Sequence, residues 1–204
     1  MKKTPSPPTL NVPHEVRIIG GQWKRSKLPV VDRPGLRPTP ARVRETLFNW
    51  LGQDLSGWRC VDAFAGTGAL GLEAASRGAQ EVVLVEQDVA LARRLSAVCS
   101  RLKASGVRVE RGDGVAALLQ RQGLGLDLVL LDPPFSDSQG KVNTDLYRDA
   151  LRAARLVVKD DGFIYLEAPQ VWNADELAQL GLQAHRHGTA GAVAFHLLRL
   201  LPVQ

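Results

Sequence analysis

The sharpest chemical motif in the sequence is Asp132-Pro133-Pro134-Phe135, which directly follows an apolar run at residues 128–131. Two successive prolines fix the backbone and leave carbonyls without adjacent N–H donors, while Phe135 offers a flat face to a base. An aryl amine is a poor nucleophile because its lone pair is delocalised into the ring. The Asp132 carboxylate and a proline carbonyl could each accept one of its N–H groups and favour a pyramidal nitrogen. The motif therefore predicts in-line group transfer to an exocyclic amino group, without a metal.

A glycine-containing loop predicts the second part of the site. It reads Asp62-Ala63-Phe64-Ala65-Gly66-Thr67-Gly68. Gly66 and Gly68 permit a tight turn and close backbone approach to a ligand at the start of the following helix. The glycine pattern by itself equally suggests a nicotinamide dinucleotide site. Asp62 separates the two readings, because its carboxylate would repel a pyrophosphate but attract the ammonium and sulfonium of S-adenosylmethionine.

Further acidic residues end the neighbouring predicted strands. Glu86 could accept hydrogen bonds from ribose hydroxyls of either cofactor, and Asp113 could accept one from an adenine amino group. Taken singly, such acids most often cap helices or face water. Four of them at strand ends predict a ligand site at the carboxyl edge of a sheet. The predicted cofactor-binding residues are Asp62, Phe64, Gly66, Gly68, Glu86, Asp113 and Gly114.

The elements that would hold these residues alternate between strands and helices. Short β-rich runs are expected at 60–64, 81–86, 107–110, 127–132 and 163–167, and helices at 69–77, 89–103, 114–122 and 146–158. Because the strands are nearly all apolar, the pattern predicts a doubly wound, mostly parallel α/β sheet with helices on both faces. Two adjacent strands at 182–187 and 192–200 would place one antiparallel strand at the end of that sheet.

The N-terminal part of the chain has a different character. Residues 1–15 are Pro-rich and predict a disordered tail, and residues 16–31 predict a hairpin. A helix should follow, with Thr39 as its cap and Pro40 in its first turn. We therefore expect a tail at 1–15, an extension that contacts RNA at 16–52 and a methyltransferase domain at 53–204.

The positive charge is concentrated at this end. The net charge is +5, but residues 1–45 hold ten Lys and Arg against three acids, or +7, which leaves 16 against 18, or −2, for the rest. This asymmetry is typical of an arm that approaches a polyanion, although a basic tail kept for solubility remains equally open. No apolar run is long enough for a membrane span, and the histidines have no metal-ligand spacing, so we expect a cytoplasmic protein without a metal. The predicted RNA contacts are Arg17, Trp23, Lys24, Arg25, Lys27, Arg37, Arg42 and Arg44.

With these residues in place, the chain resembles the RsmD-type family of bacterial methyltransferases, which modify the N2 amino group of a guanine in 16S ribosomal RNA. The resemblance spans residues 16–200 and depends on segments 17–23, 37–51, 62–71 and 132–135. It implies a Rossmann-like seven-stranded sheet with a small N-terminal hairpin, S-adenosylmethionine at the Gly66 loop and catalysis at Asp132. It also implies a substrate of the guanine-966 type in a partly assembled small ribosomal subunit. We expect the protein to act as a monomer.

Other functions fit parts of the pattern. The same tetrapeptide serves adenine-N6 methyltransferases of DNA, and a related Asn-Pro-Pro-Tyr motif serves methyltransferases of protein glutamine. A dinucleotide-dependent oxidoreductase would leave Asp62 and the two prolines without a role. A module that binds RNA and has lost activity would not need all the acidic residues at the strand ends.

Overall fold

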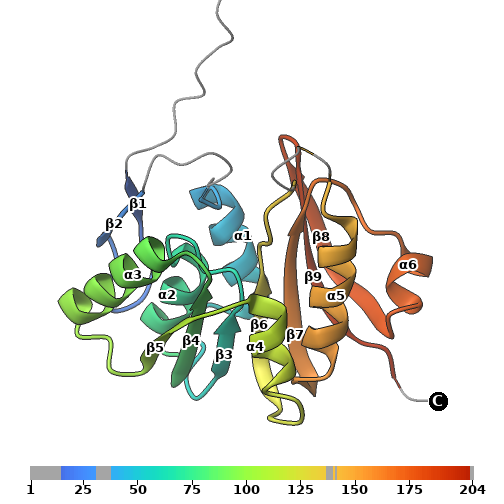
Figure 1. The fold of residues 1–204 in the computed structure, drawn as a ribbon. Helices are drawn as coiled ribbons and strands as arrows, with labels where there is room; N and C mark the ends of the chain where they lie inside the picture. The colour runs from blue at the N-terminus through green and yellow to red at the C-terminus, as the bar shows by residue number, and fades with distance from the viewer. Residues whose placement is uncertain (1–14, 31–37, 137–139, 141, 203–204) are drawn as a thin grey trace, which may run out of the picture.

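The computed structural model of the protein describes residues 15–30, 38–136, 140 and 142–202 (Figure 1). The expected disordered tail, apart from its last residue, lies outside the described residues, and so does Arg37. None of the described helices is long and apolar enough to cross a membrane.

Seven strands within the described residues form one sheet, in the order β5-β4-β3-β6-β7-β9-β8. They are β3 (Arg59–Asp62), β4 (Glu81–Glu86), β5 (Val107–Arg111), β6 (Leu126–Leu131), β7 (Val158–Ala168), β8 (Leu182–Ala190) and β9 (Val193–Leu200). Strands β3 to β7 pair in parallel, whereas β9 runs antiparallel between β7 and β8. The predicted mostly parallel sheet with an antiparallel end is confirmed.

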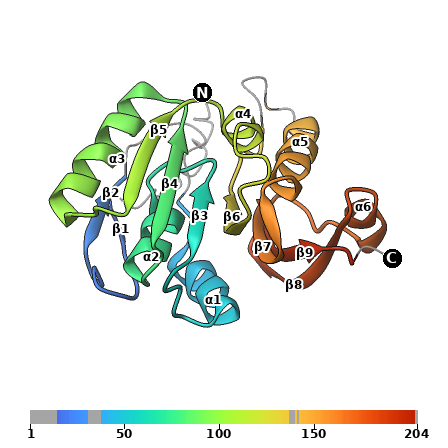
Figure 2. The same cartoon turned by 90° about the horizontal axis from the view of Figure 1, so that it is seen from below.

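Helices cover both faces of this sheet, as predicted (Figures 1 and 2). On one face, α1 (Ala41–Leu51), α2 (Ala69–Ser76) and α3 (Val89–Leu102) pack over one cluster of buried apolar side chains. On the other, α4 (Gly114–Leu119), α5 (Thr144–Arg155) and α6 (Ala174–Ala178) pack over a second cluster. The side chains of successive strand residues enter the two clusters alternately, because they point to opposite faces of the sheet.

The N-terminal hairpin is fastened to the end of α2. Strands β1 (Glu15–Arg17) and β2 (Lys27–Pro29) pair antiparallel, which confirms the predicted hairpin. Between them, Gln22 N–H donates to the Ser76 carbonyl at 2.7 Å. Gly21 has a φ of +70°, and a Cβ there would lie 1.7 Å from the same Ser76 oxygen. Only glycine therefore fits where the hairpin turn crosses α2.

A buried ion cluster joins this hairpin to α1 and α2. The Glu73 carboxylate is 0% exposed and pairs with Arg44 at 3.2 Å and Arg77 at 2.9 Å. It also accepts the backbone N–H groups of Ile19 and Gly20, each at 2.7 Å. Buried charges persist when they are paired and hydrogen-bonded in this way, so Glu73 ties three segments of the chain to one point.

Candidate active site

Three of the predicted acidic residues meet at the carboxyl edge of the sheet. Strand β3 lies between β4 and β6. Asp62 ends β3, Glu86 ends β4 and Asp132 directly follows β6. The carboxyl ends of neighbouring parallel strands form the usual ligand crevice of open α/β sheets, so the structure brings these side chains to the place that the sequence predicted.

The loop from β3 to α2 contains two glycines in a left-handed conformation. Gly66 and Gly68 have φ angles of +52° and +77°, in the left-handed region that favours glycine. Glu86 holds the loop, because its two oxygens accept the N–H groups of Gly66 at 2.9 Å and Asp88 at 2.8 Å. Each carboxylate oxygen can accept a second hydrogen bond, so Glu86 can stabilise the loop and still accept from a ligand hydroxyl.

Asp62 is a buried acid, and one of its two carboxyl oxygens has no hydrogen-bond partner in the part of the chain that the structure describes. Its side chain is 1% exposed, and Oδ2 accepts the N–H of Gly71 at 2.9 Å. Oδ1 is buried without a hydrogen-bond partner among the described residues. Burial raises the pKa of Asp62 to about 7, the backbone N–H groups of Gly71 and Phe64 oppose that rise, and the charge of Glu86 adds to it. A bound cation would satisfy the remaining oxygen and stabilise the ionised carboxylate.

Asp113 and Gly114 bring the start of α4 against the glycine loop. Asp113 caps α4, because its Oδ1 accepts the N–H of Ala116 at 2.8 Å. A Cβ at Gly114 would lie 2.2 Å from the Ala63 carbonyl and 3.2 Å from the Phe64 ring, so the two segments touch directly. Asp113 therefore has the capping role common for such acids, at a position beside the predicted cofactor loop.

Two hydrogen bonds hold the Asp132-Pro133-Pro134-Phe135 segment in place, one from Tyr147 of α5 and one from Asn143, the residue before α5. The Pro133 carbonyl accepts the Tyr147 hydroxyl at 3.3 Å, and the Pro134 carbonyl accepts the Asn143 side-chain amide at 2.9 Å. Each carbonyl retains a second lone pair. Phe135 is partly buried against the cluster of apolar side chains beneath α4 and α5. These contacts fix the prolines while Asp132 stays at the sheet edge.

Glu167, near the end of β7, is a site residue that the sequence reasoning missed. It is 3% exposed, and its Oε1 accepts the hydroxyl groups of Thr39 at 2.6 Å and Tyr165 at 3.1 Å. The same Thr39 oxygen lies 3.5 Å from Asp132 Oδ2. Glu167 closes the predicted strand 163–167, so the rule that selected Asp62, Glu86 and Asp132 would also have found it.

The role predicted for Thr39 is wrong in detail. Helix α1 begins after Pro40, and no side chain of the described residues caps it by a hydrogen bond. The Thr39 hydroxyl instead turns toward the two carboxyl groups. Glu167 is 3% exposed, so an unsatisfied carboxyl oxygen there would be costly, and the Thr39 hydroxyl satisfies it.

The proximity of these acids changes their protonation. Burial raises the pKa of Asp132 well above its usual range, and the charges of Glu167 and Asp62 raise it further. Burial also raises the pKa of Glu167, while the hydroxyls of Thr39 and Tyr165 oppose that rise. Carboxylates so close together repel one another, so the site favours either a shared proton or a bound cation.

The predicted RNA contacts are mostly exposed, but several have partners on the protein. Arg17 and Lys27 pair with Glu15 at 3.1 and 3.0 Å on the hairpin surface. Arg25 and Arg42 are exposed, whereas Trp23 is partly buried and packs against the core beneath α1 to α3.

Arg44 corrects the prediction, because the residue is 1% exposed. It pairs with Glu73 at 3.2 Å and donates to the carbonyls of Thr39 at 3.2 Å and Arg17 at 3.0 Å. A side chain enclosed in this way cannot reach RNA at the surface. The basic character of segment 37–51 misled the prediction here.

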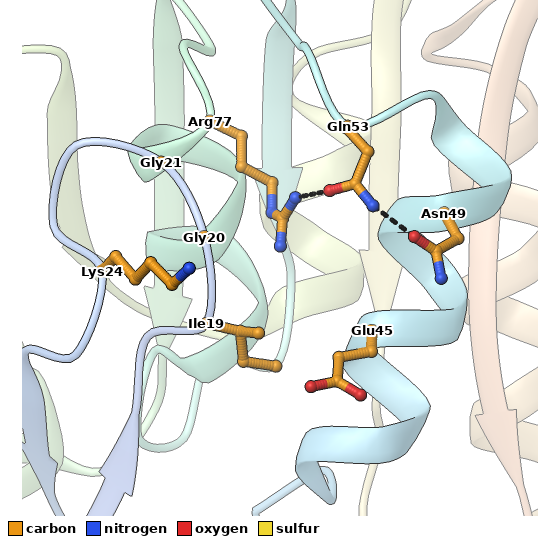
Figure 3. Close-up of a pocket in the computed structure, with 8 residues that line it drawn as sticks. All are labelled: Ile19, Gly20, Gly21, Lys24, Glu45, Asn49, Gln53 and Arg77. Carbon is orange, nitrogen blue, oxygen red and sulfur yellow. Dashed lines mark hydrogen bonds between the residues drawn. The ribbon is translucent and has the colours of Figure 1, made fainter.

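Lys24 points into a pocket of about 480 Å³ between the hairpin turn and α1 (Figure 3). Arg77 faces it and donates to Gln53, which in turn donates to Asn49. The lining residues are Ile19, Gly20, Gly21, Lys24, Glu45, Asn49, Gln53 and Arg77. None of them belongs to the strand-end acids, so this pocket is separate from the candidate active site.

The fold and the site together define a methyltransferase of the Rossmann-like α/β class: an open sheet, a glycine loop after β3 and an Asp-Pro-Pro-Phe segment after β6. Residues 16–199 match the protein family described as Conserved hypothetical protein 95. The chain is 42% identical over 183 residues to Ribosomal RNA small subunit methyltransferase D of Escherichia coli (strain K12), covering 90% of this chain and 89% of that protein. The chain described in this structure belongs to the family whose model matches residues 16–199.

Solved structures agree with that assignment. An Escherichia coli protein assigned as a methyltransferase superposes with a TM-score of 0.75 at 35% identity, over 92% of this chain and 98% of that one. A Haemophilus influenzae protein assigned as a methylase superposes with a TM-score of 0.73 at 33% identity, over 92% and 99% of the two chains. The similarity therefore extends over nearly the whole length of both relatives.

Proposed function

We propose that this protein transfers a methyl group from S-adenosylmethionine to the exocyclic N2 amino group of a guanine in 16S ribosomal RNA, of the guanine-966 type, during assembly of the small subunit. The observation that supports it most is that Asp132-Pro133-Pro134-Phe135 shares one sheet edge with Asp62 and the glycine loop. Acceptors suited to an amino group thus lie beside residues suited to a cationic methyl donor.

The residues at the β3 edge fit S-adenosylmethionine. The unpartnered Asp62 Oδ1 is a buried acceptor that a cationic donor would satisfy. Gly66 and Gly68 carry no side chain where the loop turns, Glu86 has lone pairs available for the ribose hydroxyls, and Asp113 borders the loop where the adenine amino group would lie. When bound, the cofactor supplies a methyl group on a positively charged sulfur.

Asp132 and a proline carbonyl act on the substrate amine. A guanine amino group has two N–H bonds, and the two acceptors can take one each, so that the nitrogen becomes pyramidal and its lone pair is freed from the ring. Fixing the carbonyls by Tyr147 and Asn143 preorganises these acceptors. Preorganised acceptors and close approach of the amine supply most of the rate enhancement in such a site.

An RNA substrate is supported by the charge of the hairpin and by the relatives. Lys24, Arg25 and Lys27 are exposed on the hairpin segment. Two relatives are named as methyltransferases of small-subunit ribosomal RNA, one from Escherichia coli and one from Haemophilus influenzae. The exocyclic amine, the partly assembled subunit and the monomeric state are parts of the proposal.

The test supplies labelled S-adenosylmethionine and small ribosomal subunits that lack the modification, then digests the RNA and identifies the labelled nucleoside. We expect N2-methylguanosine, and no label in subunits that already carry the modification. Labelled N6-methyladenosine in DNA, or label in protein, would replace the proposed substrate by one of the other amines that this tetrapeptide serves. A protein that binds the cofactor but labels none of these would contradict the proposal.

A further inference from the structure

The carboxyl groups of Glu167 and Asp132 both lie close to the Thr39 hydroxyl. Thr39 has one hydroxyl proton, and at 2.6 Å it donates that proton to Glu167 rather than to Asp132, which lies 3.5 Å away. The Thr39 oxygen keeps a lone pair that can accept a hydrogen bond from Asp132 when Asp132 is protonated. The geometry links the two carboxyl groups through one hydroxyl.

Glu167 is an acid enclosed within the protein, and its side-chain partners decide whether it can carry a charge. The side chain is 3% exposed, so ionising it is costly unless the charge is paired and hydrogen-bonded. The hydroxyls of Thr39 and Tyr165 both donate to the same oxygen, Oε1, as they would to an ionised carboxylate. Arg44, whose Nε donates to the Thr39 carbonyl at 3.2 Å, also favours the ionised form. The hydroxyls of Thr39 and Tyr165 and the charge of Arg44 thus oppose the rise that burial causes in the pKa of Glu167, and they favour its ionised form next to Asp132.

Methyl transfer to an amino group, on which this inference rests, needs a base. A nitrogen–carbon bond forms, the carbon–sulfur bond breaks with its electron pair left on sulfur, and the nitrogen must lose one proton. A carboxylate that takes this proton becomes neutral while the sulfonium becomes a neutral thioether. The charges of the site then cancel before and after the step.

We propose that Glu167 is a positioning residue that acts through Asp132, its buried negative charge making Asp132 the group that takes the proton from the amino nitrogen. A like charge nearby makes a carboxylate more basic, and a more basic acceptor removes the proton more effectively. Without Glu167, Asp132 would accept a hydrogen bond from the amine but would be a weaker base.

The rate of methyl transfer should depend on pH through the Asp132 and Glu167 pair. The titratable and charged groups that face the pair are Asp62 on β3, Tyr147 on α5, Tyr165 on β7 and Arg44 on α1. Asp62 also raises the pKa of Asp132, whereas Arg44 acts mainly on Glu167. Activity should fall as pH decreases through the raised pKa of Asp132, since a protonated Asp132 cannot take the proton.

The experiment compares wild type, Glu167→Gln and Glu167→Asp. The Asp132 side-chain carboxyl carbon is titrated by NMR in the free protein, and the single-turnover rate of methyl transfer to unmodified small subunits is measured against pH. Glu167→Gln should lower the Asp132 midpoint by about one unit or more, move the acid limb of the rate profile down with it, and slow the plateau rate about tenfold. Glu167→Asp keeps the charge and should keep the raised midpoint.

An unchanged Asp132 midpoint and acid limb in a folded Glu167→Gln protein would overturn the proposal. Wild type gives a second test that needs no variant, because the Asp132 and Glu167 signals should titrate together in two steps. Independent titration of the two groups would also overturn it. Failure of wild type to label RNA would contradict the proposed function instead, since the NMR titration needs no substrate.

Discussion

Replacing Glu73 by alanine should destabilise the fold far more than replacing Glu15, although each carboxylate pairs with two cationic side chains. Glu73 is 0% exposed, and without it the guanidinium groups of Arg44 and Arg77 stay buried without their carboxylate partner. Breaking one buried ion pair by removing a partner costs about 3–5 kcal/mol. Two backbone N–H groups would also be left without their acceptor, at about 1–3 kcal/mol each. We expect the free energy of unfolding to fall by at least about 4 kcal/mol.

The assay is equilibrium urea denaturation followed by tryptophan fluorescence, with Glu15→Ala as the matched control. The Glu15 side chain is 38% exposed, and exposed pairs contribute only about 0–1 kcal/mol. Thermal unfolding should give the same ranking, with the Glu73→Ala midpoint about 8 °C or more below wild type. If Glu73→Ala lies within about 1 kcal/mol of Glu15→Ala, the buried cluster does not join the hairpin to the helices.

Two further predictions concern charge. Burial raises the pKa of Asp62 from 3.8 to about 7 in the folded protein, so the folded state loses stability as pH rises from 3.8 to about 7. Asp62→Asn removes this loss, and its free energy of unfolding should exceed that of wild type by about 2–4 kcal/mol at pH 8 but not at pH 4. The same variant should bind S-adenosylmethionine more weakly. Denaturation at both pH values checks this, and a difference independent of pH would contradict it. Substituting Lys24, Arg25 and Lys27 by alanine should weaken RNA binding and reduce the logarithmic salt slope by about 0.7 for each phosphate that the hairpin no longer neutralises; an unchanged slope would remove the hairpin from the interface.

The sheet and its helices were predictable because their signals are local. Apolar runs such as 81–86 coincide with β4, and helical periodicity located α2 to α5. Helix α6 was not predicted, since it has only five residues and little room for a periodic pattern. Strand β7 begins at Val158, five residues before the predicted run, because pairing with Leu126 extends it through a polar stretch.

The sequence predicted the site residues that follow the ends of strands. It did not predict the roles of residues that depend on tertiary contacts. Asp62, Glu86 and Asp132 follow from the parallel order of their strands. Thr39 looks like a helix cap in the sequence, because nothing local shows that a buried acid 128 residues away accepts its hydroxyl proton. Arg44 looks like a surface cation for the same reason, because its partner Glu73 lies on another helix.

Asp132→Ala tests the central claim, that Asp132 acts on the substrate amine next to a separately formed cofactor site. Cofactor affinity is measured by calorimetry and methyl transfer to unmodified small subunits by single-turnover kinetics, with the unfolding midpoint as the check on folding. We predict that the affinity for S-adenosylmethionine changes by less than about threefold while the transfer rate falls on the order of 10²-fold or more. Equal losses of affinity and rate would make Asp132 a structural residue, and an unchanged rate would contradict the account outright.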